Sequence, residues 1–172
     1  MSKDLFQTIC LAWAGIAVAT FVLLLFVKAP YGRHVTKGWG PQISNKLGWI
    51  LMELPSFACI LYFFTNYGHS AYASFLLILW LVHYANRTFV FPLRIRTRGK
   101  KMPLIIVISA VAFNLVNAGL NGYYLSFFEH YSSDDFLSWE FLFGIVIFIT
   151  GALINLKSDH ILINLRKPSE AG

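Results

Sequence analysis

Five long apolar runs divide this chain and restrict it to one class of fold. Each approaches or exceeds the roughly 20 residues that a helix needs to cross the hydrocarbon core of a bilayer. Backbone groups in hydrocarbon must find their hydrogen bonds within the span, which favours helices. The sequence therefore predicts an all-α, polytopic transmembrane helix bundle that forms a single membrane domain. The expected spans are about 6–27, 47–64, 71–91, 103–127 and 139–154, followed by a polar tail at 155–172.

Composition supports an integral membrane protein. The chain is 57% hydrophobic and 13% charged, whereas soluble domains average roughly 25% charged residues. The first run is preceded by Lys3 and Asp4 and is too long for a signal-peptide core, so we interpret it as a span. Cys10 and Cys59 lie in apolar runs and are expected to be small buried hydrophobes. We expect membrane lipid but no nucleic acid among the partners, and no metal site, because the histidines are scattered.

The charges sort by loop and predict an orientation. Segment 28–46 and the segment between the third and fourth runs are basic and contain no acid, whereas 128–138 holds three acids and no Lys or Arg. The positive-inside rule then places the basic loops and the tail in the cytoplasm and the N-terminus outside. A bacterial inner membrane and an endoplasmic reticulum both remain open. The basic loops serve either as topology signals alone or also as a site for a phosphorylated ligand.

The stretch Glu53-Leu54-Pro55-Ser56-Phe57 lies inside the second apolar run. A carboxylate at membrane depth costs a few kcal/mol unless a partner or a water-filled cavity receives it. Pro55 cannot donate a hydrogen bond to the carbonyl of Leu51, so we expect the helix to bend or open there. We interpret Glu53 as a functional residue; the alternative is an internal polar contact with another helix.

A second polar group closes the third run. Tyr84, Arg87 and Thr88 are three and four residues apart and share a helical face, and His83 is four residues before Arg87. Arg87 reaching the interface and Tyr84 in an aromatic belt are the alternative explanations. A neutral carboxylic acid and a phenol can both donate a hydrogen bond to a carbonyl oxygen. Glu53 and Tyr84 together would thus polarise an enone and stabilise its developing enolate.

Two further stretches are less specific. In the fourth run, small residues at Ala118, Gly119 and Gly122 favour close helix packing, with Asn117 and Asn121 as groups that hydrogen-bond between helices. The alternative for this stretch is direct contact with a ligand. In the tail, four residues repeat at helical spacing and form one stripe: Asn155, Asp159, Leu162 and Arg166. Arg166 suits a phosphate, and Asn155 and Asp159 suit a ribose or a carboxamide. The alternative is a helix end resting on the membrane surface.

Taken in order, these stretches resemble the steroid 5α-reductases over nearly the whole chain. Five segments carry the resemblance: Tyr31-Gly32-Arg33-His34, the run 49–57 with Glu-Leu-Pro-Ser-Phe, His83-Tyr84 with Arg87-Thr88-Phe89-Val90, Asn121-Gly122-Tyr123-Tyr124, and 155–168 with Ser-Asp-His-Ile-Leu and Leu-Arg-Lys-Pro. Each motif alone is weak, but five in the same order are a specific signal.

The resemblance implies NADPH-dependent reduction of the 4,5 double bond of a 3-oxo-Δ4 steroid, with hydride added at C5 and a proton at C4. By motif position, Glu53 and Tyr84 would hold the C3 carbonyl. The remaining implied residues contact or support the cofactor and its cavity: Asn155, Asp159, Arg166, Arg87, Arg98, Trp49 and Tyr31.

Three departures from the family pattern qualify the resemblance. Met52 stands where a Gln is expected, which bears on cavity polarity, and Phe91 stands where a Tyr is expected. The stretch 91–99 also looks longer than in well-known animal members. Family members have about seven spans, so we interpret this five-span chain as an N-terminal portion or a truncated form.

Three other functions compete with this interpretation. An enoyl-thioester reductase of the same broad family would reduce a fatty acyl equivalent of the enone. A non-catalytic membrane lipid-binding module would have no affinity for NADPH and would tolerate changes at Asp159 and Arg166. A membrane methyltransferase would require S-adenosylmethionine, and its chemistry has no evident use for the stretch around Glu53.

Overall fold

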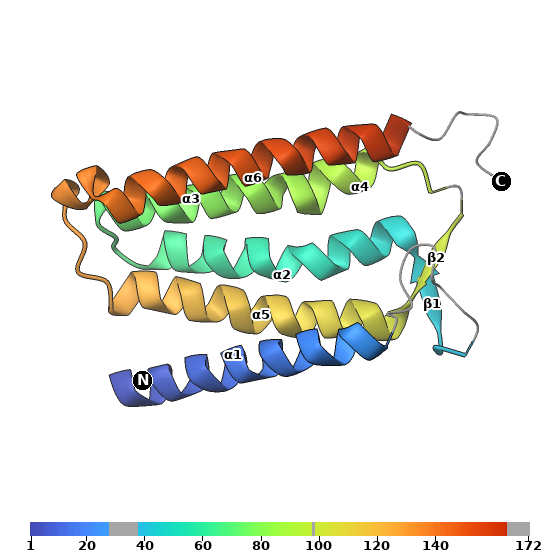
Figure 1. The fold of residues 1–172 in the computed structure, drawn as a ribbon, viewed down its shortest axis with the longest axis horizontal. Helices are drawn as coiled ribbons and strands as arrows, with labels where there is room; N and C mark the ends of the chain where they lie inside the picture. The colour runs from blue at the N-terminus through green and yellow to red at the C-terminus, as the bar shows by residue number, and fades with distance from the viewer. Residues whose placement is uncertain (28–37, 98, 165–172) are drawn as a thin grey trace.

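The fold is a set of helices running side by side (Figure 1). The structure, a computed structural model, describes residues 1–27, 38–97 and 99–164. Five helices within these ranges are long and apolar enough to cross a membrane, which confirms the predicted all-α bundle. These are α1 (Lys3–Phe26), α2 (Asn45–Asn66), the composite third span Ala71–Arg94, α5 (Leu104–Phe127) and α6 (Trp139–Asn164).

The third span contains an irregular turn that the sequence interpretation did not foresee. Helix α3 (Ala71–Ala85) passes into a π-helical turn, η2 (Asn86–Val90), and then into α4 (Phe91–Arg94). Pro92 has no amide hydrogen to offer the carbonyl four residues before it. The chain instead uses a wider turn, in which the amide of Phe91 donates to the carbonyl of Asn86. Such π turns are frequent at functional sites.

Helix α2, in contrast, does not open at Pro55. It is a continuous helix from Asn45 to Asn66 with the proline inside it. Its buried positions, Gly48, Met52, Ser56 and Ile60, follow one another at four-residue intervals and form one stripe. Neighbouring helices on this stripe support the helix where the proline removes a backbone bond. The expected opening of α2 is therefore wrong, and the irregular backbone lies in the neighbouring span.

The core lies between α2 and its two neighbouring spans, α3 and α5. At one end Met52 packs with Met102 and Val107, and further along Ile60 packs with Leu77 of α3 and Ala118 of α5. A short antiparallel pair of strands, β1 (Gln42–Ser44) and β2 (Lys101–Pro103), pairs the residues that precede α2 and α5. The two basic loops are thus tied together at the same end of the bundle.

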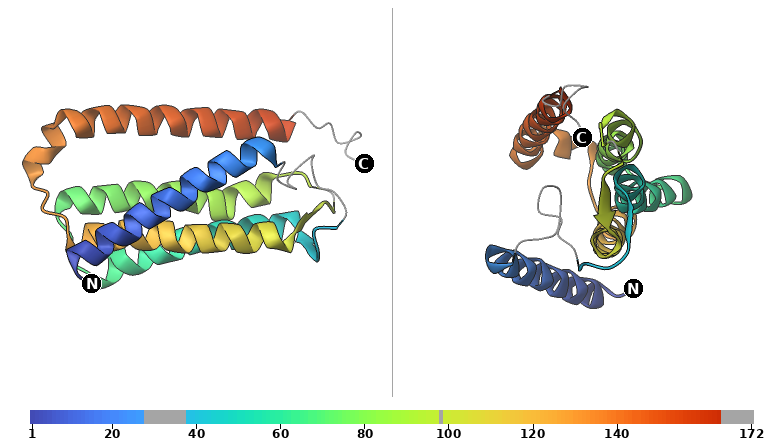
Figure 2. Two further views of the ribbon diagram at one scale, coloured as in Figure 1. Left: turned by 60° about the horizontal axis from the view of Figure 1, so that its bottom comes forward. Right: turned by 90° about the vertical axis from the view of Figure 1, so that its right-hand side faces the viewer.

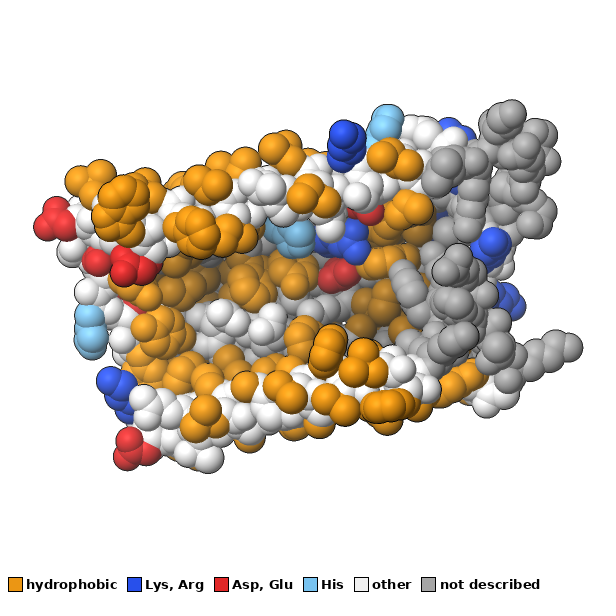
Figure 3. Space-filling view, in the orientation of Figure 1, with side chains coloured by type: hydrophobic (Ala, Val, Ile, Leu, Met, Phe, Trp, Pro, Cys, Tyr) orange, Lys and Arg blue, Asp and Glu red, His pale blue; other side chains and the backbone are white. Residues whose placement is uncertain are grey.

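Helices α1 and α6 stand apart from this core. In the end-on view of Figure 2, both lie to one side of the group formed by α2, the third span and α5. None of the apolar window of either helix is buried. Helix α6 continues past Ile154, where we expected the last span to end, to Asn164. The space-filling view shows a hollow between the outer helices, with a largely apolar lining (Figure 3).

Candidate active site

Arg87 brings two carboxylates from different helices together. Its Nη2 lies 3.7 Å from Glu53 Oε1 on α2, and its Nη1 donates a 3.2 Å hydrogen bond to Asp159 Oδ2 on α6. The three side chains are between 13% and 15% exposed. Two carboxyl groups therefore share one guanidinium in a poorly solvated place, and ionisable groups gathered in this way are typical of functional sites within membranes.

Two aromatic rings hold the guanidinium of Arg87. Its central carbon lies 4.7 Å from the ring centroid of Trp49 and 4.6 Å from that of Phe91. The two rings meet edge to face at 5.0 Å. Cation–π contacts of this kind stabilise a desolvated cation by about 2 kcal/mol. Phe91, which departs from the family pattern, thus takes part in the site through its ring face.

Tyr84 completes the group expected from the sequence. It stands three residues before Arg87 and lies within electrostatic range of both Glu53 and Arg87. Its ring stacks on Trp80 at 5.3 Å and meets the ring of His83 at 5.2 Å. The stacking restrains the direction of the phenol, which lies within electrostatic range of the acid on α2.

Three buried polar atoms near these helices have no hydrogen-bond partner among the described residues: Ser56 Oγ, Trp80 Nε1 and Thr88 Oγ1. The Ser56 hydroxyl lies beside Tyr84, and Trp80 stacks on it. Buried polar atoms are normally hydrogen-bonded. Two of these atoms therefore belong to residues that adjoin Tyr84.

Asn114 of α5 is a residue of this site that the sequence interpretation missed. Its Nδ2 donates a 2.6 Å hydrogen bond to the carbonyl oxygen of Met52, and its side chain is a polar neighbour of the Glu53 carboxyl group. A lone amide inside an apolar run was the available signal. The expectation that Asn117 and Asn121 bond between helices is wrong, because Asn121 donates to the carbonyl of Asn117 within α5.

The other expected residues divide into three groups. Asn155 lies one turn before Asp159 on the same partly buried face of α6. Met52 packs in the core with Met102 and Val107, so its departure from the family pattern falls on packing. The remaining expected cofactor contacts lie outside the described residues: Tyr31, Arg98 and Arg166.

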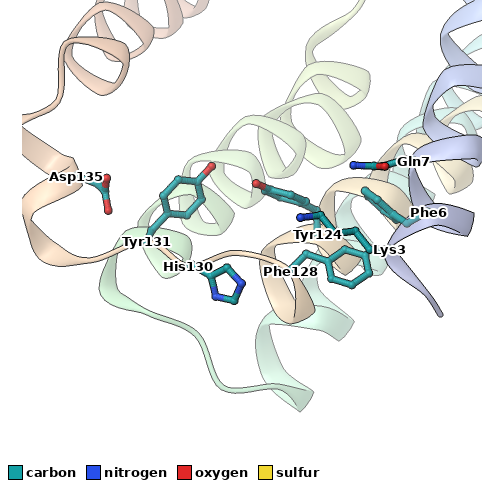
Figure 4. Close-up of a pocket in the computed structure, with 8 residues that line it drawn as sticks. All are labelled: Lys3, Phe6, Gln7, Tyr124, Phe128, His130, Tyr131 and Asp135. Carbon is teal, nitrogen blue, oxygen red and sulfur yellow. The ribbon is translucent and has the colours of Figure 1, made fainter.

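A pocket at the opposite end of the bundle contains none of these groups. It encloses about 410 Å³ between the first turns of α1, the end of α5 and the segment after it (Figure 4). Its lining residues are Lys3, Phe6, Gln7, Tyr124, Phe128, His130, Tyr131 and Asp135. Burial, together with the neighbouring Tyr124 hydroxyl, raises the pKa of Tyr131 to about 12. The pocket is far along the bundle from Arg87, so we assign it no part in the candidate active site.

The chain is similar to known proteins over most of its length. The family model for 3-oxo-5-alpha-steroid 4-dehydrogenase matches residues 100–172. The steroid 5-alpha-reductase DET2 of Gossypium hirsutum is 37% identical over 177 residues, which cover 99% of this chain and 68% of that protein. The 3-oxo-5-alpha-steroid 4-dehydrogenase 1 of Bos taurus is 39% identical over 92% of this chain and 63% of its own length.

The human 3-oxo-5-alpha-steroid 4-dehydrogenase 1 is 36% identical over 92% of this chain and 62% of its own length. The chain thus spans about two thirds of the length of these relatives. On this similarity, the chain belongs to the steroid 5α-reductase family of membrane oxidoreductases.

Proposed function

We propose that this protein reduces the 4,5 double bond of 3-oxo-Δ4 steroids with NADPH, adding hydride at C5 and a proton at C4. One observation carries the proposal. An acid and a phenol from adjacent spans, Glu53 and Tyr84, lie within electrostatic range of one another in a chain of this family. The apolar hollow between the outer helices offers a lipid-facing approach for a steroid (Figure 3).

Glu53 and Tyr84 would donate hydrogen bonds to the C3 carbonyl oxygen. As hydride reaches C5, negative charge moves onto that oxygen, and donors already aimed at it stabilise the resulting enolate. Glu53 can donate only as a neutral acid. When it is protonated, the cluster keeps one anion, Asp159, and one cation, Arg87, and becomes electrically neutral. Asp159 then balances the charge of Arg87 without Glu53.

The residues near Arg87 fit a dinucleotide cofactor by their chemistry. Asn155 offers an amide, Asp159 a carboxylate acceptor, and Trp49 with Phe91 an aromatic frame around a guanidinium. Bound NADPH would supply the hydride. Basic side chains at the same end would bind its phosphates: Lys46, Arg94, Lys100 and Lys101. We include Tyr31, Arg98 and Arg166 in the proposed cofactor site on motif position.

We propose the orientation of the protein across the membrane from the end of the bundle that carries both the candidate site and the basic loops. The candidate site lies towards the start of α2 and the ends of the third span and α6, where the basic loops are joined by β1 and β2. The positive-inside rule makes this end cytoplasmic and places the N-terminus outside. NADPH would then enter from the cytoplasm and the steroid from the bilayer.

The test is conversion of a 3-oxo-Δ4 steroid by purified protein, with product identified by mass spectrometry. Two forms are compared: the 172-residue chain and a chimera continued past Gly172 with the C-terminal third of the Gossypium hirsutum relative. We expect NADPH-dependent formation of the 5α-reduced steroid by at least one form. Failure of both forms while NADPH binds would overturn the steroid assignment, and a parallel assay with an enoyl thioester would test the rival reductase. Failure to bind NADPH would favour a lipid-binding module.

A further inference from the structure

We propose that Asn114 is a positioning residue for Glu53, holding both the backbone before it and its carboxyl group. The inference rests on the proposed role of Glu53 and adds a residue on a third span to the machinery. Asn114 belongs to α5, which contributes none of the residues expected at the site from the sequence.

Asn114 is a polar residue buried within the apolar helix α5. Its side chain is 7% exposed in the middle of an apolar helix. A buried amide without partners costs several kcal/mol in an apolar environment. The 2.6 Å bond to the carbonyl of Met52 satisfies one of its donors. Asn114 thus links α5 to the residue immediately before Glu53.

The hydrogen bond to the carbonyl of Met52 fixes which way the side-chain amide of Asn114 faces. A carbonyl oxygen can only accept a hydrogen bond, so the NH₂ group must face Met52. The orientation of the remaining donor and of the amide oxygen is then determined, within reach of Glu53. An amide can donate to a carboxylate and accept from a neutral acid, so Asn114 can hold Glu53 in either protonation state.

Glu53 needs a partner that holds its carboxyl group in place. Its contact with Arg87, at 3.7 Å, is longer than a hydrogen bond and does not fix the direction of the carboxyl group. Pro55 also leaves the carbonyl of Leu51 without its usual backbone donor, directly beside Met52. Asn114 therefore pins α2 where its own hydrogen bonding is weakest, one residue away from the proposed acid.

The decisive experiment replaces Asn114 with leucine, which has a similar size but no polar group. Asn121→Leu is the matched control, because Asn121 lies on the same helix and bonds only within it among the described contacts. Two readouts are used in the form of the protein that turns over. One is the split between kcat and KM, and the other is the infrared band of the Glu53 carboxyl group, identified by its loss in Glu53→Gln.

We expect Asn114→Leu to lower kcat about tenfold to hundredfold, the usual effect of removing a hydrogen bond to a charged or ionisable group. The KM for NADPH should stay within about twofold, because no cofactor contact is altered. The Glu53 band should shift in Asn114→Leu but not in Asn121→Leu. Asn114→Gln, which keeps the amide, should recover part of the rate and of the band position.

An unchanged Glu53 band and kcat in Asn114→Leu, with only a lower melting temperature, would reduce Asn114 to a packing residue and overturn the proposal. Where Asn114→Leu does not fold, Asn114→Ser applies the same test with a smaller disturbance. The infrared measurement needs no turnover. A shifted band in a protein that reduces no steroid would uphold the positioning role while the proposed function fails.

Discussion

The two ends of the bundle hold their acidic side chains in opposite ways. At the end away from the basic loops, Asp135 accepts hydrogen bonds from the backbone amide and hydroxyl of Ser132, and Glu129 accepts one from the amide of Tyr131. At the basic end, Glu53 and Asp159 share Arg87, which comes from another span. Acids held by their own loop stabilise that loop, whereas acids gathered across helices around one cation are available for chemistry.

The aromatic side chains differ in the same way. At the acidic end, Tyr72 stacks against Tyr131 at 4.5 Å and lies beside Phe136 and Phe141, so these rings mainly pack on one another. At the basic end, Trp49 and Phe91 turn their faces to the guanidinium of Arg87. One end uses aromatic rings as packing material, and the other uses them to hold a charge.

The largest effect should come from exchanging one acid at each end for its amide. Glu53→Gln keeps the shape of the side chain but removes the acidic proton, so we expect turnover to fall by about a hundredfold or more. Asp135→Asn removes a loop acid and should leave turnover unchanged while lowering the melting temperature. Steady-state rates and thermal unfolding of both variants test this difference between the two ends. Equal losses of turnover in the two variants would contradict it.

A smaller effect is expected at the third member of the cluster. Asp159→Asn weakens the 3.2 Å charge-assisted bond to Arg87 and removes a proposed cofactor contact. Such bonds contribute about 1.5–3 kcal/mol, so the affinity for NADPH should fall about tenfold or more. Fluorescence titration with NADPH measures it. Asp134→Asn, an acid in the short helix η3 (Ser133–Leu137), is the control. Unaltered affinity in Asp159→Asn would remove this residue from the cofactor site.

Packing near the two ends can be compared with two glycines. A methyl group at Gly122 would meet the Phe63 ring, and one at Gly48 would meet the Met102 side chain. Overpacking costs about 1–3 kcal/mol, but a flexible methionine side chain adapts more easily than a rigid aromatic ring. Gly122→Ala should therefore destabilise more than Gly48→Ala in thermal unfolding. Gly119→Ala, with open space around it, is the control. The reverse order would contradict this difference in packing.

The smallest effect concerns Tyr131 in the pocket of Figure 4. Burial first, and then the hydrogen bond with Tyr124, raise its pKa to about 12 from the usual value of about 10. The folded state therefore holds this proton more tightly. The resulting stability is complete below pH about 10 and is lost as pH rises towards about 12. Tyr131→Phe should unfold with a weaker dependence on pH in this window, as measured by thermal unfolding across a pH series.

Much of the fold was readable from the chain alone. Apolar runs of membrane length have few alternatives to helices, because hydrocarbon offers no partner for backbone groups. The polar residues inside those runs were also conspicuous, since each costs free energy unless it has a use. Glu53, Tyr84 and Arg87 were therefore identified as candidates, whereas Asp159 was proposed from the stripe in the polar tail, and the five ordered motifs pointed to the family.

Only the tertiary structure decided how these residues meet. Sequence spacing places side chains on a face of one helix but does not say which helices adjoin, so the bridge from Glu53 through Arg87 to Asp159 could not be derived. For the same reason the role of Asn114 could not be predicted, because its partner, the carbonyl of Met52, is 62 residues away in the sequence. The π turn could not be predicted either. A proline inside a helix signals an irregularity, but the sequence does not say whether the helix kinks there or widens into a π turn. Composition and periodicity determine that a chain enters the membrane as helices, whereas long-range contacts determine which of its polar groups form a site.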